Sequence, residues 1–286
     1  MCVLFRDKAV YYNEWEAGTC RLFVRREVRD MNQAERRRFL IESLLKEKTE
    51  YQGLVVPKDT PGQRKLLRAL MNVRSPEAMN AEFLNVQDAY LQQLLEESGS
   101  TDVEQLTPVD GTLYLWQGDI TKLRCDAIVN AANSGLTGCY VPCHACIDNC
   151  IHTYAGVQLR LACNDLMQKQ GHEERAGQAK ITKAYNLPCK YVLHTVGPIV
   201  NGSVTPKEEQ QLASCYSACL KLAAQYDVKS IAFCCISTGV FHFPNERAAE
   251  IAVNTVRSYL QETGSTMKVI FDVFKDRDKE IYEQLL

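Results

Sequence analysis

The sequence lacks a long hydrophobic run, and it lacks an excess of charge of either sign. Its longest apolar stretch, SIAFCCISTGVF at 230–241, is far shorter than the roughly 20 residues that span a bilayer. Charged residues soon interrupt the apolar start of MCVLFRDKAV, so the N-terminus has no secretory h-region. Lys and Arg total 33 and Asp and Glu total 35, and a formal charge of −2 does not suit a surface for duplex nucleic acid. We therefore expect a soluble, cytoplasmic protein that binds neither membranes nor nucleic acid.

A disulfide framework is not expected either, although the chain contains 13 cysteines. The count is odd and the chain is 286 residues long, whereas secreted disulfide scaffolds are small and pair their cysteines. In a reducing compartment, scattered cysteines are usually small buried hydrophobic residues. Only a cluster of cysteines would need another explanation.

The character of the sequence changes near residue 105. Before that point, apolar residues recur at three- and four-residue intervals, which predicts helices over 33–47, 62–72 and 82–96. The first 30 residues are ambiguous, and RLFVRREV at 21–28 could form a strand. We therefore predict a mainly helical N-terminal extension over 1–105 and a second domain over 106–286.

In the second domain, segments with the character of strands alternate with helical ones. Six segments are typical of strands, several of them apolar enough to be buried on both faces: TLYLWQGDI, DAIVNAAN, AKITKAYNL, YVLHTVGP, KSIAFCCIS and MKVIFDVF. The helical patterns cover 147–170, 205–225, 244–261 and 278–286. Thr205 and Glu208 indicate a capping box at the start of the second of these helices. The alternation predicts an α/β domain around a mostly parallel sheet, in which ligands bind at the carboxyl ends of the strands.

The first loop of interest runs from Gly118 to Asn133. Asp119 could accept a hydrogen bond from an exocyclic amine such as that of adenine, and Ile120 could offer its backbone N–H to a ring nitrogen. The simpler interpretation, that Asp119 only turns the chain, is favoured when this residue is taken alone. Asn130 and Asn133 flank a small-residue turn, where an amide side chain can both donate to and accept from ribose hydroxyls. Asn is also tolerated in tight turns for structural reasons.

The second loop, CCISTGVFHFPNE at 234–246, follows a buried strand. Consecutive backbone N–H groups in such a turn can form an anion-binding concavity, and Gly239 would permit close approach of a diphosphate. Phe241 is an apolar loop residue that could stack against a ligand. The Ser-Thr-Gly sequence is weak by itself, because many strand-to-helix turns use these residues.

The third loop, GCYVPCHACIDNCIH at 138–152, gathers cysteines and histidines. Thiolate and imidazole at this spacing suit tetrahedral zinc, and three protein ligands would leave one position open. His144 and Cys146 are alternate residues, which an extended stretch directs to one side, and Cys139 can fold back through Pro142. Two alternatives remain, namely cysteines buried by chance and a redox pair formed by the CxxC of Cys143 and Cys146.

Asp148 begins the helix that follows this loop. It could stabilise the helix N-terminus or act as an acid/base group beside a metal. A plain N-terminal helix charge is the simpler interpretation.

Together, five motifs closely resemble the macrodomain family, in order and in context: GDIT (118–121), DAIVNAAN (126–133), IHTYAG (151–156), HTVGP (194–198) and ISTGVFHFP (236–244). The resemblance covers about residues 111–286 and implies a three-layer α/β/α macrodomain with a mixed, mostly parallel sheet that binds ADP-ribose. By motif, Asp119 and Ile120 would hold adenine. The diphosphate would lie on the loop of Ser237, Thr238, Gly239, Val240 and Phe241. The distal ribose would lie beside Phe241, enclosed by Asn133 and by Ile147, Asp148 and Asn149.

One departure from the common pattern is informative, because GCYVPCHACID stands where hydrolytic macrodomains have a run of glycines. This form resembles the zinc-containing macrodomains, microbial ADP-ribosyl hydrolases that also carry a helical N-terminal extension. The resemblance implies one Zn²⁺ per chain with the ligands Cys139, His144 and Cys146, and it leaves out Cys143. It also implies a substrate protein that is mono-ADP-ribosylated on an acidic side chain. In some relatives a sirtuin-like transferase and a lipoyl-carrier protein are the enzymatic counterpart and the target.

Our hypothesis is zinc-dependent hydrolysis of the bond between ADP-ribose and the modified side chain. Zinc would polarise an oxygen near the distal ribose or lower the pKa of a water to about 7. Asp148 would orient that water or move a proton, and Asn133 would fix the ribose. The alternatives are a non-catalytic ADP-ribose reader with a structural zinc and a CxxC thiol oxidoreductase. The extension has no chemical motif, so we expect its deletion to impair stability or substrate choice rather than zinc content.

Overall fold

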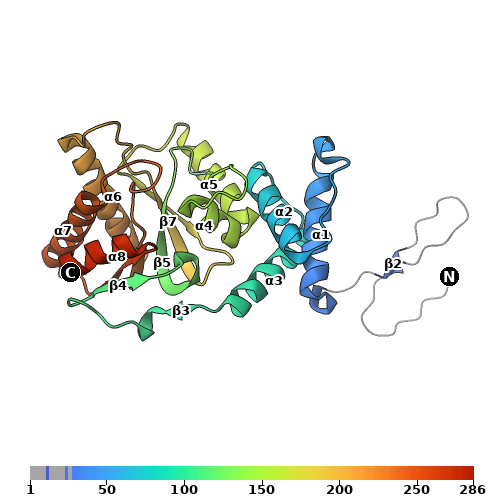
Figure 1. The fold of residues 1–286 in the computed structure, drawn as a ribbon, viewed down its shortest axis with the longest axis horizontal. Coiled ribbons are helices and arrows are strands. Elements are labelled where there is room, and N and C mark those ends of the chain that lie inside the picture. Colours follow the sequence, from blue (N-terminus) through green and yellow to red (C-terminus); the bar gives the residue numbers. More distant parts are fainter. Residues whose placement is uncertain (1–10, 13–22, 25–27) are drawn as a thin grey trace, which may run out of the picture.

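A computed structural model describes residues 11–12, 23–24 and 28–286 of the chain (Figure 1). Strand β1 (Tyr11–Tyr12) pairs antiparallel with β2 (Phe23–Val24). The possible strand at 21–28 coincides with β2 in part, and a 3-10 helix, η1 (Val28–Asp30), begins at its last residue. The other residues of that segment lie outside the described residues.

The three helices predicted for the extension are all present. They are α1 (Gln33–Lys46), α2 (Thr60–Val73) and α3 (Ala81–Ser98), with a short 3-10 helix, η2 (Thr49–Tyr51), after the first. Each begins where a capping side chain accepts a main-chain N–H of the first turn, and these caps are Asn32, Asp59 and Asn80. Their buried faces form a small core with members such as Leu40, Ile41, Leu67, Phe83 and Val86. Val157 of the second domain joins this core, so the extension packs directly onto that domain.

The second domain is built on a mixed sheet in the order β4-β9-β8-β5-β7-β6. Its strands are β4 (Leu113–Gln117), β5 (Leu123–Ala131), β6 (Ala179–Lys183), β7 (Cys189–Thr195), β8 (Ser230–Phe233) and β9 (Lys268–Val273). A short strand β3 (Thr101–Asp102), followed by η3 (Val103–Gln105), pairs in parallel with the start of β5. The β6–β7 pair is antiparallel and the other pairs of this sheet are parallel. All six predicted strand segments therefore contain a strand, and the mostly parallel sheet is confirmed.

Helices cover both faces of this sheet (Figure 1). They are α4 (Ile147–Ala155), α5 (Val157–Gln170), α6 (Pro206–Gln225), α7 (Asn245–Thr263) and α8 (Asp276–Leu285). The predicted capping box of Thr205 and Glu208 is present at the start of α6. The helical stretch predicted over 147–170 is present as two helices, α4 and α5, with a break at Gly156. Gly156 has a φ of +96°, a left-handed conformation that ends α4 and lets α5 start in a new direction.

Most of the described cysteines outside the third loop are buried in the core. Cys163, Cys215 and Cys219 have 0% exposed surface and pack in the main hydrophobic cluster of the second domain. All described cysteines are free thiols. Apart from the cluster in the third loop, these cysteines thus behave as the small hydrophobic residues that the sequence analysis expected.

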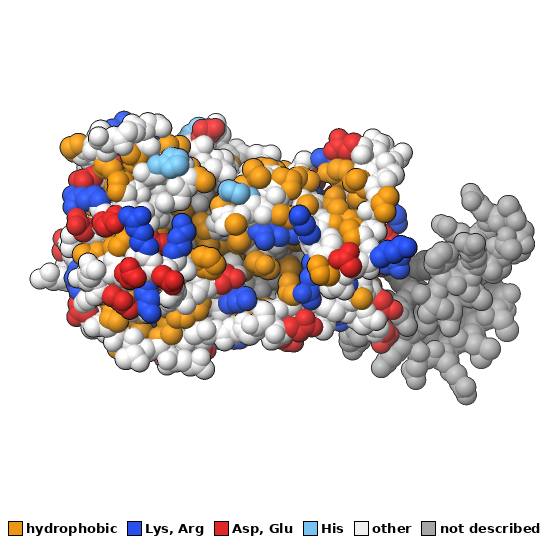
Figure 2. Space-filling view, in the orientation of Figure 1, with side chains coloured by type: hydrophobic (Ala, Val, Ile, Leu, Met, Phe, Trp, Pro, Cys, Tyr) orange, Lys and Arg blue, Asp and Glu red, His pale blue; other side chains and the backbone are white. Residues whose placement is uncertain are grey.

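The distribution of charged side chains on the surface agrees with the near-equal numbers of acidic and basic residues in the sequence. On the described part of the face shown in Figure 2, acidic and basic side chains are interspersed, without a broad area of one sign. Among the described helices, none combines the length and the apolar composition that crossing a membrane would require.

Candidate active site and metal-binding loop

The three loops chosen from the sequence leave the same edge of the sheet. Strands β4, β9, β8 and β5 are consecutive parallel neighbours, so their carboxyl ends lie side by side. The Gly118–Thr121 turn follows β4, the Cys139-containing loop follows β5, and the Ser237–Phe241 loop follows β8. The topology therefore brings the candidate adenine, diphosphate and distal-ribose residues to one edge, as parallel sheets do at their binding sites.

Asp119 caps a short 3-10 helix, η4 (Ile120–Lys122), at the end of β4. Its Oδ1 accepts from the main-chain N–H of Thr121 at 3.0 Å and from the Thr121 hydroxyl at 2.6 Å. A Cβ at Gly118 would come within 2.3 Å of the Trp116 ring, so only glycine fits before this turn. The chain-turning role of Asp119 is therefore present, and contact with adenine stays a prediction for Asp119 and the buried Ile120.

The Ser237–Phe241 loop is held largely by its own backbone. The Phe243 N–H donates to the Ser237 carbonyl at 3.0 Å, and the His242 N–H donates to the Gly239 carbonyl at 3.1 Å. Ser237 has a left-handed φ of +66° and is buried, while Gly239 and Val240 are exposed. Thr238 donates its hydroxyl to the Cys235 carbonyl at 3.1 Å. This tight turn leaves Gly239 open to close approach, as the binding of a diphosphate would require.

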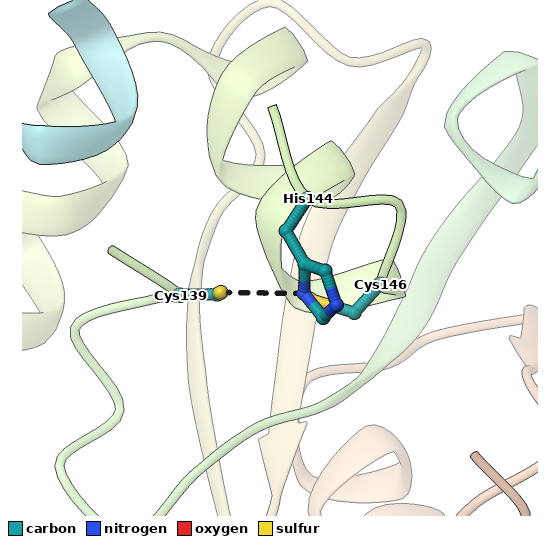
Figure 3. Close-up of side chains that lie close together, drawn as sticks. All are labelled: Cys139, His144 and Cys146. Atoms are coloured by element: carbon teal, nitrogen blue, oxygen red, sulfur yellow. Dashed lines mark hydrogen bonds between the residues drawn. The ribbon is translucent and has the colours of Figure 1, made fainter. Parts of the chain in front are cut away.

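Cys139, His144 and Cys146 are brought together in front of α4 (Figure 3). Their ligand atoms all lie within 4.8 Å of one another, and Cys139 Sγ is 3.6 Å from His144 Nδ1. Cys146 occupies the N-cap position of α4, where its sulfur accepts the main-chain N–H of Asn149 at 3.4 Å. The three residues that the sequence indicated as metal ligands thus place their ligand atoms close enough together to bind one ion.

The chemistry of this group suits a divalent metal ion. Two sulfur atoms and one imidazole nitrogen are the donors that Zn²⁺ prefers. Burial raises the pKa of the Cys146 thiol to about 12, and the nearby Cys139 thiol adds to the shift. A bound cation would remove this penalty by stabilising the thiolates. The residues present therefore fit zinc.

Cys143 lies apart from this group. Its Sγ is 3.4 Å from the Lys65 carbonyl of α2, and its backbone adopts a left-handed φ of +54°. The sulfur of Cys146 lies instead with Cys139 and His144. This arrangement disfavours the CxxC redox pair as the reason for the cysteine cluster.

Asp148 is a buried carboxylate in the first turn of α4, with 5% of its surface exposed. Asn130 Nδ2 donates to its Oδ1 at 2.8 Å, and Asn133 Nδ2 lies 3.4 Å from its Oδ2. Burial raises the pKa of this carboxyl group to about 6, against the opposing effect of the Asn130 hydrogen bond and of Arg160. The two asparagines of the DAIVNAAN motif therefore orient Asp148 two residues after a candidate metal ligand.

The sequence suggested that Asn130, like Asn133, could bind ribose hydroxyls, but it did not predict that the Asn130 side chain donates a hydrogen bond to Asp148. The Asn130 side chain is fully buried, and its Nδ2 also lies 3.2 Å from His194 Nδ1. The available indication was its place at the carboxyl end of β5, in the same motif as Asn133.

A second group of metal-type side chains, His152, Cys163 and His194, was also missed. Their ligand atoms lie within 4.8 Å of one another, and all three side chains are buried. His194 Nε2 is 2.9 Å from the Thr182 hydroxyl, so both of its ring nitrogens have hydrogen-bond partners. Burial lowers the pKa of His194 to about 3, which keeps the ring neutral. Cys163 and His194 are linked to each other and, through His194, to Asn130, whereas neither ring nitrogen of His152 has a hydrogen-bond partner among the described residues.

The other predicted ribose-site residues lie on α4. Ile147 is partly buried at the helix start. Asn149 is fully buried, and its Nδ2 donates to the Cys139 and Val141 carbonyls at 3.3 and 3.0 Å. Its side chain therefore holds the candidate metal-binding loop, residues 138–146, a role that the sequence did not predict.

Comparison with known proteins identifies the family to which this fold belongs. Residues 129–252 match the family described as the Macro domain. The chain is 57% identical to a Treponema medium protein named "Protein-ADP-ribose hydrolase" over 260 residues, which is 90% of this chain and 100% of that protein. A Staphylococcus aureus (strain MSSA476) protein of the same name is 50% identical over 248 residues, 86% of this chain and 93% of that protein.

Among solved structures, the Trypanosoma brucei macrodomain in complex with ADP-ribose is 30% identical, with a TM-score of 0.60. It covers 76% of this chain, and this chain covers 94% of it. The sheet order, the binding edge and these similarities agree, and the chain belongs to the macrodomain family.

Proposed function

We propose that this protein hydrolyses the bond that joins ADP-ribose to a modified protein side chain. The names of the Treponema medium and Staphylococcus aureus relatives support this activity, since each is matched over nearly its whole length. The observation that carries the proposal is the position of Asp148, a buried carboxylate held by Asn130 and Asn133 at the carboxyl edge of the sheet.

In this proposal the nucleotide lies along the edge formed by the three loops. Asp119 and Ile120 receive adenine after β4. The diphosphate lies against Ser237, Thr238, Gly239 and Val240, where the loop exposes its backbone at Gly239. Phe241 packs beside the distal ribose, and the solved macrodomain named as a complex with ADP-ribose supports a nucleotide ligand of this size.

Asp148 and Asn133 act on the distal ribose. Hydrolysis adds the elements of water across the bond and releases ADP-ribose and the free side chain. The Asp148 carboxylate orients the attacking water or accepts its proton, because its two oxygens are held by separate asparagines. Asn133 is exposed, so its amide can also reach a ribose hydroxyl.

We further propose that Cys139, His144 and Cys146 hold one Zn²⁺ beside this ribose. Zinc bound there would supply Lewis acidity next to the reacting bond. Support comes from the donor set and from the separations of at most 4.8 Å between the ligand atoms. Cys146 begins the helix that carries Asp148, so this ligand and the carboxylate are fixed to each other by one turn of α4.

The substrate that we propose is a protein mono-ADP-ribosylated on an acidic side chain. A lipoyl-carrier protein modified by a sirtuin-like transferase is one candidate, and only the resemblance to zinc-containing macrodomains supports it. A cytoplasmic location goes with such a substrate and is part of the same proposal.

The test is release of ADP-ribose from a mono-ADP-ribosylated carrier protein, followed by mass spectrometry of the carrier. The Asp148→Ala variant is expected to lose about 100- to 10,000-fold in rate while still binding ADP-ribose, because loss of a proton-transfer group costs that much. An exposed substitution such as Asn85→Ala on α3 is the matched control. ADP-ribose binding by the wild-type protein without any release would instead show a reader whose zinc is structural.

A further inference from the structure

The metal-binding loop rests on the N-terminal extension through direct hydrogen bonds to α2. Between β5 and α4 the described loop residues form no helix or strand, and a backbone hydrogen bond from the His144 N–H to the Val141 carbonyl at 3.2 Å is supplemented by contacts from α2 and α5. Figure 1 shows α2 beside α4, and the two helices are in contact. Two side chains of α2, Asn72 and Arg68, and one of α5, Arg160, make these contacts.

Asn72 fixes the residue before His144. Its side chain is 1% exposed, its Oδ1 accepts the Cys143 N–H at 2.9 Å, and its Nδ2 donates to the Thr153 hydroxyl at 2.9 Å. Cys143 has a left-handed φ of +54°, which is unfavourable for a residue other than glycine and persists only where the surroundings hold it. Asn72 thus ties a strained point of the loop to α4 through Thr153.

Arg68 fixes His144 itself. Its Nη2 donates to the His144 carbonyl at 2.7 Å and to Asn149 Oδ1 at 2.9 Å, and it lies 3.5 Å from Cys150 Sγ. Asn149 in turn holds the Cys139 and Val141 carbonyls. One guanidinium of the extension therefore connects the main chain of two candidate metal ligands.

Arg160 of α5 also links the end of α2 to the loop that carries Cys139. Its side chain is 5% exposed, and Nη1 donates to the Asn72 and Arg74 carbonyls at the end of α2, both at 2.6 Å. Its Nη2 reaches the Cys139 carbonyl at 3.5 Å, and its guanidinium lies 4.2 Å from the centre of the Tyr140 ring. The end of α2 and the first metal ligand thus share one buried arginine.

We propose that Asn72 and Arg68 are positioning residues of the metal centre, so that metal affinity depends on the N-terminal extension. This inference rests on the proposed zinc site. A loop that is ordered before the metal arrives avoids an entropic cost of binding, and polar groups that orient metal ligands set the affinity of the site. Without α2, the Cys143 N–H and the His144 carbonyl would lose their partners, and Cys143 would leave its strained conformation.

The experiment is a zinc titration of the full-length protein in competition with a chromophoric chelator. Asn72→Ala and Arg68→Ala are each expected to weaken zinc binding by about 10- to 100-fold, the usual effect of losing a residue that orients a metal ligand. Arg68→Lys should recover part of this loss, because lysine can still donate to the His144 carbonyl but lacks the planar fork of arginine. The matched controls are Asn85→Ala and Arg38→Ala, which change exposed residues of α3 and α1.

Thermal unfolding of each variant separates this effect from loss of folding. Asn72 is buried, so Arg68→Ala and Arg68→Lys carry the test if Asn72→Ala does not fold. If the folded variants bind zinc as tightly as the controls do, the inference is wrong, while the proposed zinc site is unaffected. Absence of zinc binding in the wild-type protein would overturn the zinc site, and this inference with it. Hydrolysis of a modified carrier protein is measured separately, so the proposed activity stands or fails on its own.

Discussion

Two loops at the same edge of the sheet are held in different ways. The Ser237–Phe241 loop is closed by hydrogen bonds of its own backbone, from Phe243 to Ser237 and from His242 to Gly239. The loop that carries Cys139, His144 and Cys146 is held by side chains from α2, α4 and α5, of which α2 lies more than 60 positions away in the sequence. The first loop has one further backbone hydrogen bond, from the Val200 N–H to the Phe241 carbonyl at 2.9 Å, and no hydrogen bond to the described part of the extension, whereas the second contacts the extension directly. We therefore expect substitutions to separate nucleotide binding from metal binding.

Loss of a proposed metal ligand is expected to give the largest difference between the effect on zinc binding and the effect on ADP-ribose binding. His144→Ala should weaken zinc binding by more than the about 10- to 100-fold expected for a supporting residue, and it should abolish hydrolysis. Because adenine and the diphosphate are proposed to lie on other loops, affinity for ADP-ribose should fall far less than affinity for zinc. Zinc titration, ADP-ribose calorimetry and release assays on one preparation measure all three.

Removal of zinc from the wild-type protein by a chelator is the control for this variant. It should reproduce the loss of hydrolysis, and added zinc should restore it. Hydrolysis that survives thorough chelation would contradict the zinc dependence, and a parallel loss of ADP-ribose affinity would contradict the separation of the two loops.

The next largest effect is expected at Gly197, which lies against Ser237 and Ile236 at the start of the Ser237–Phe241 loop, the proposed diphosphate site. A Cβ there would come within 2.0 Å of Ser237 Oγ and within 2.8 Å of an Ile236 methyl group. Gly197→Ala should therefore lower the free energy of unfolding by about 1–3 kcal/mol, as overpacking does, and weaken ADP-ribose binding. Urea unfolding and calorimetry measure the two effects, while zinc affinity should not change.

Gly239→Ala changes a glycine within the Ser237–Phe241 loop itself, and we expect it to affect stability less than Gly197→Ala does. A Cβ at this position meets no atom within 4 Å, and its φ is not in the left-handed region. Stability should therefore be unchanged, while ADP-ribose binding weakens if the diphosphate approaches the backbone at this point. Unchanged ADP-ribose affinity would exclude Gly239 from the diphosphate site.

Much of the fold followed from periodicity in the sequence. The six strands of the second domain and the three helices of the extension were predicted because their apolar residues repeat at the intervals of these elements. The break at Gly156 could not be predicted in this way, since the helical pattern continues on both sides of it. The helix breaks because the backbone of Gly156 is left-handed and because Gln87 of α3 approaches it closely. A Cβ at Gly156 would lie 2.5 Å from Gln87 Nε2.

In the candidate site, too, residues close together in the sequence could be predicted and contacts between distant residues could not. Cys139, His144 and Cys146 were chosen from residues at most seven positions apart, and the structure brings them together. Arg68 and Asn72 lie more than 70 positions from the loop that they contact, and no local pattern reports such a pairing. We expected from the sequence that loss of the extension would spare the metal, whereas these contacts argue for the opposite.

The smallest effect is expected for Ser237→Ala. The Ser237 hydroxyl is buried and has no hydrogen-bond partner among the described residues, so its removal takes away an unsatisfied polar atom. The free energy of unfolding should stay within about 1 kcal/mol of the wild type or rise slightly, because deleting a buried hydroxyl without a partner costs little. If the hydroxyl instead donates to a phosphate oxygen, ADP-ribose affinity should fall while stability does not. A clear loss of stability without ligand would show instead that the hydroxyl helps to hold the turn.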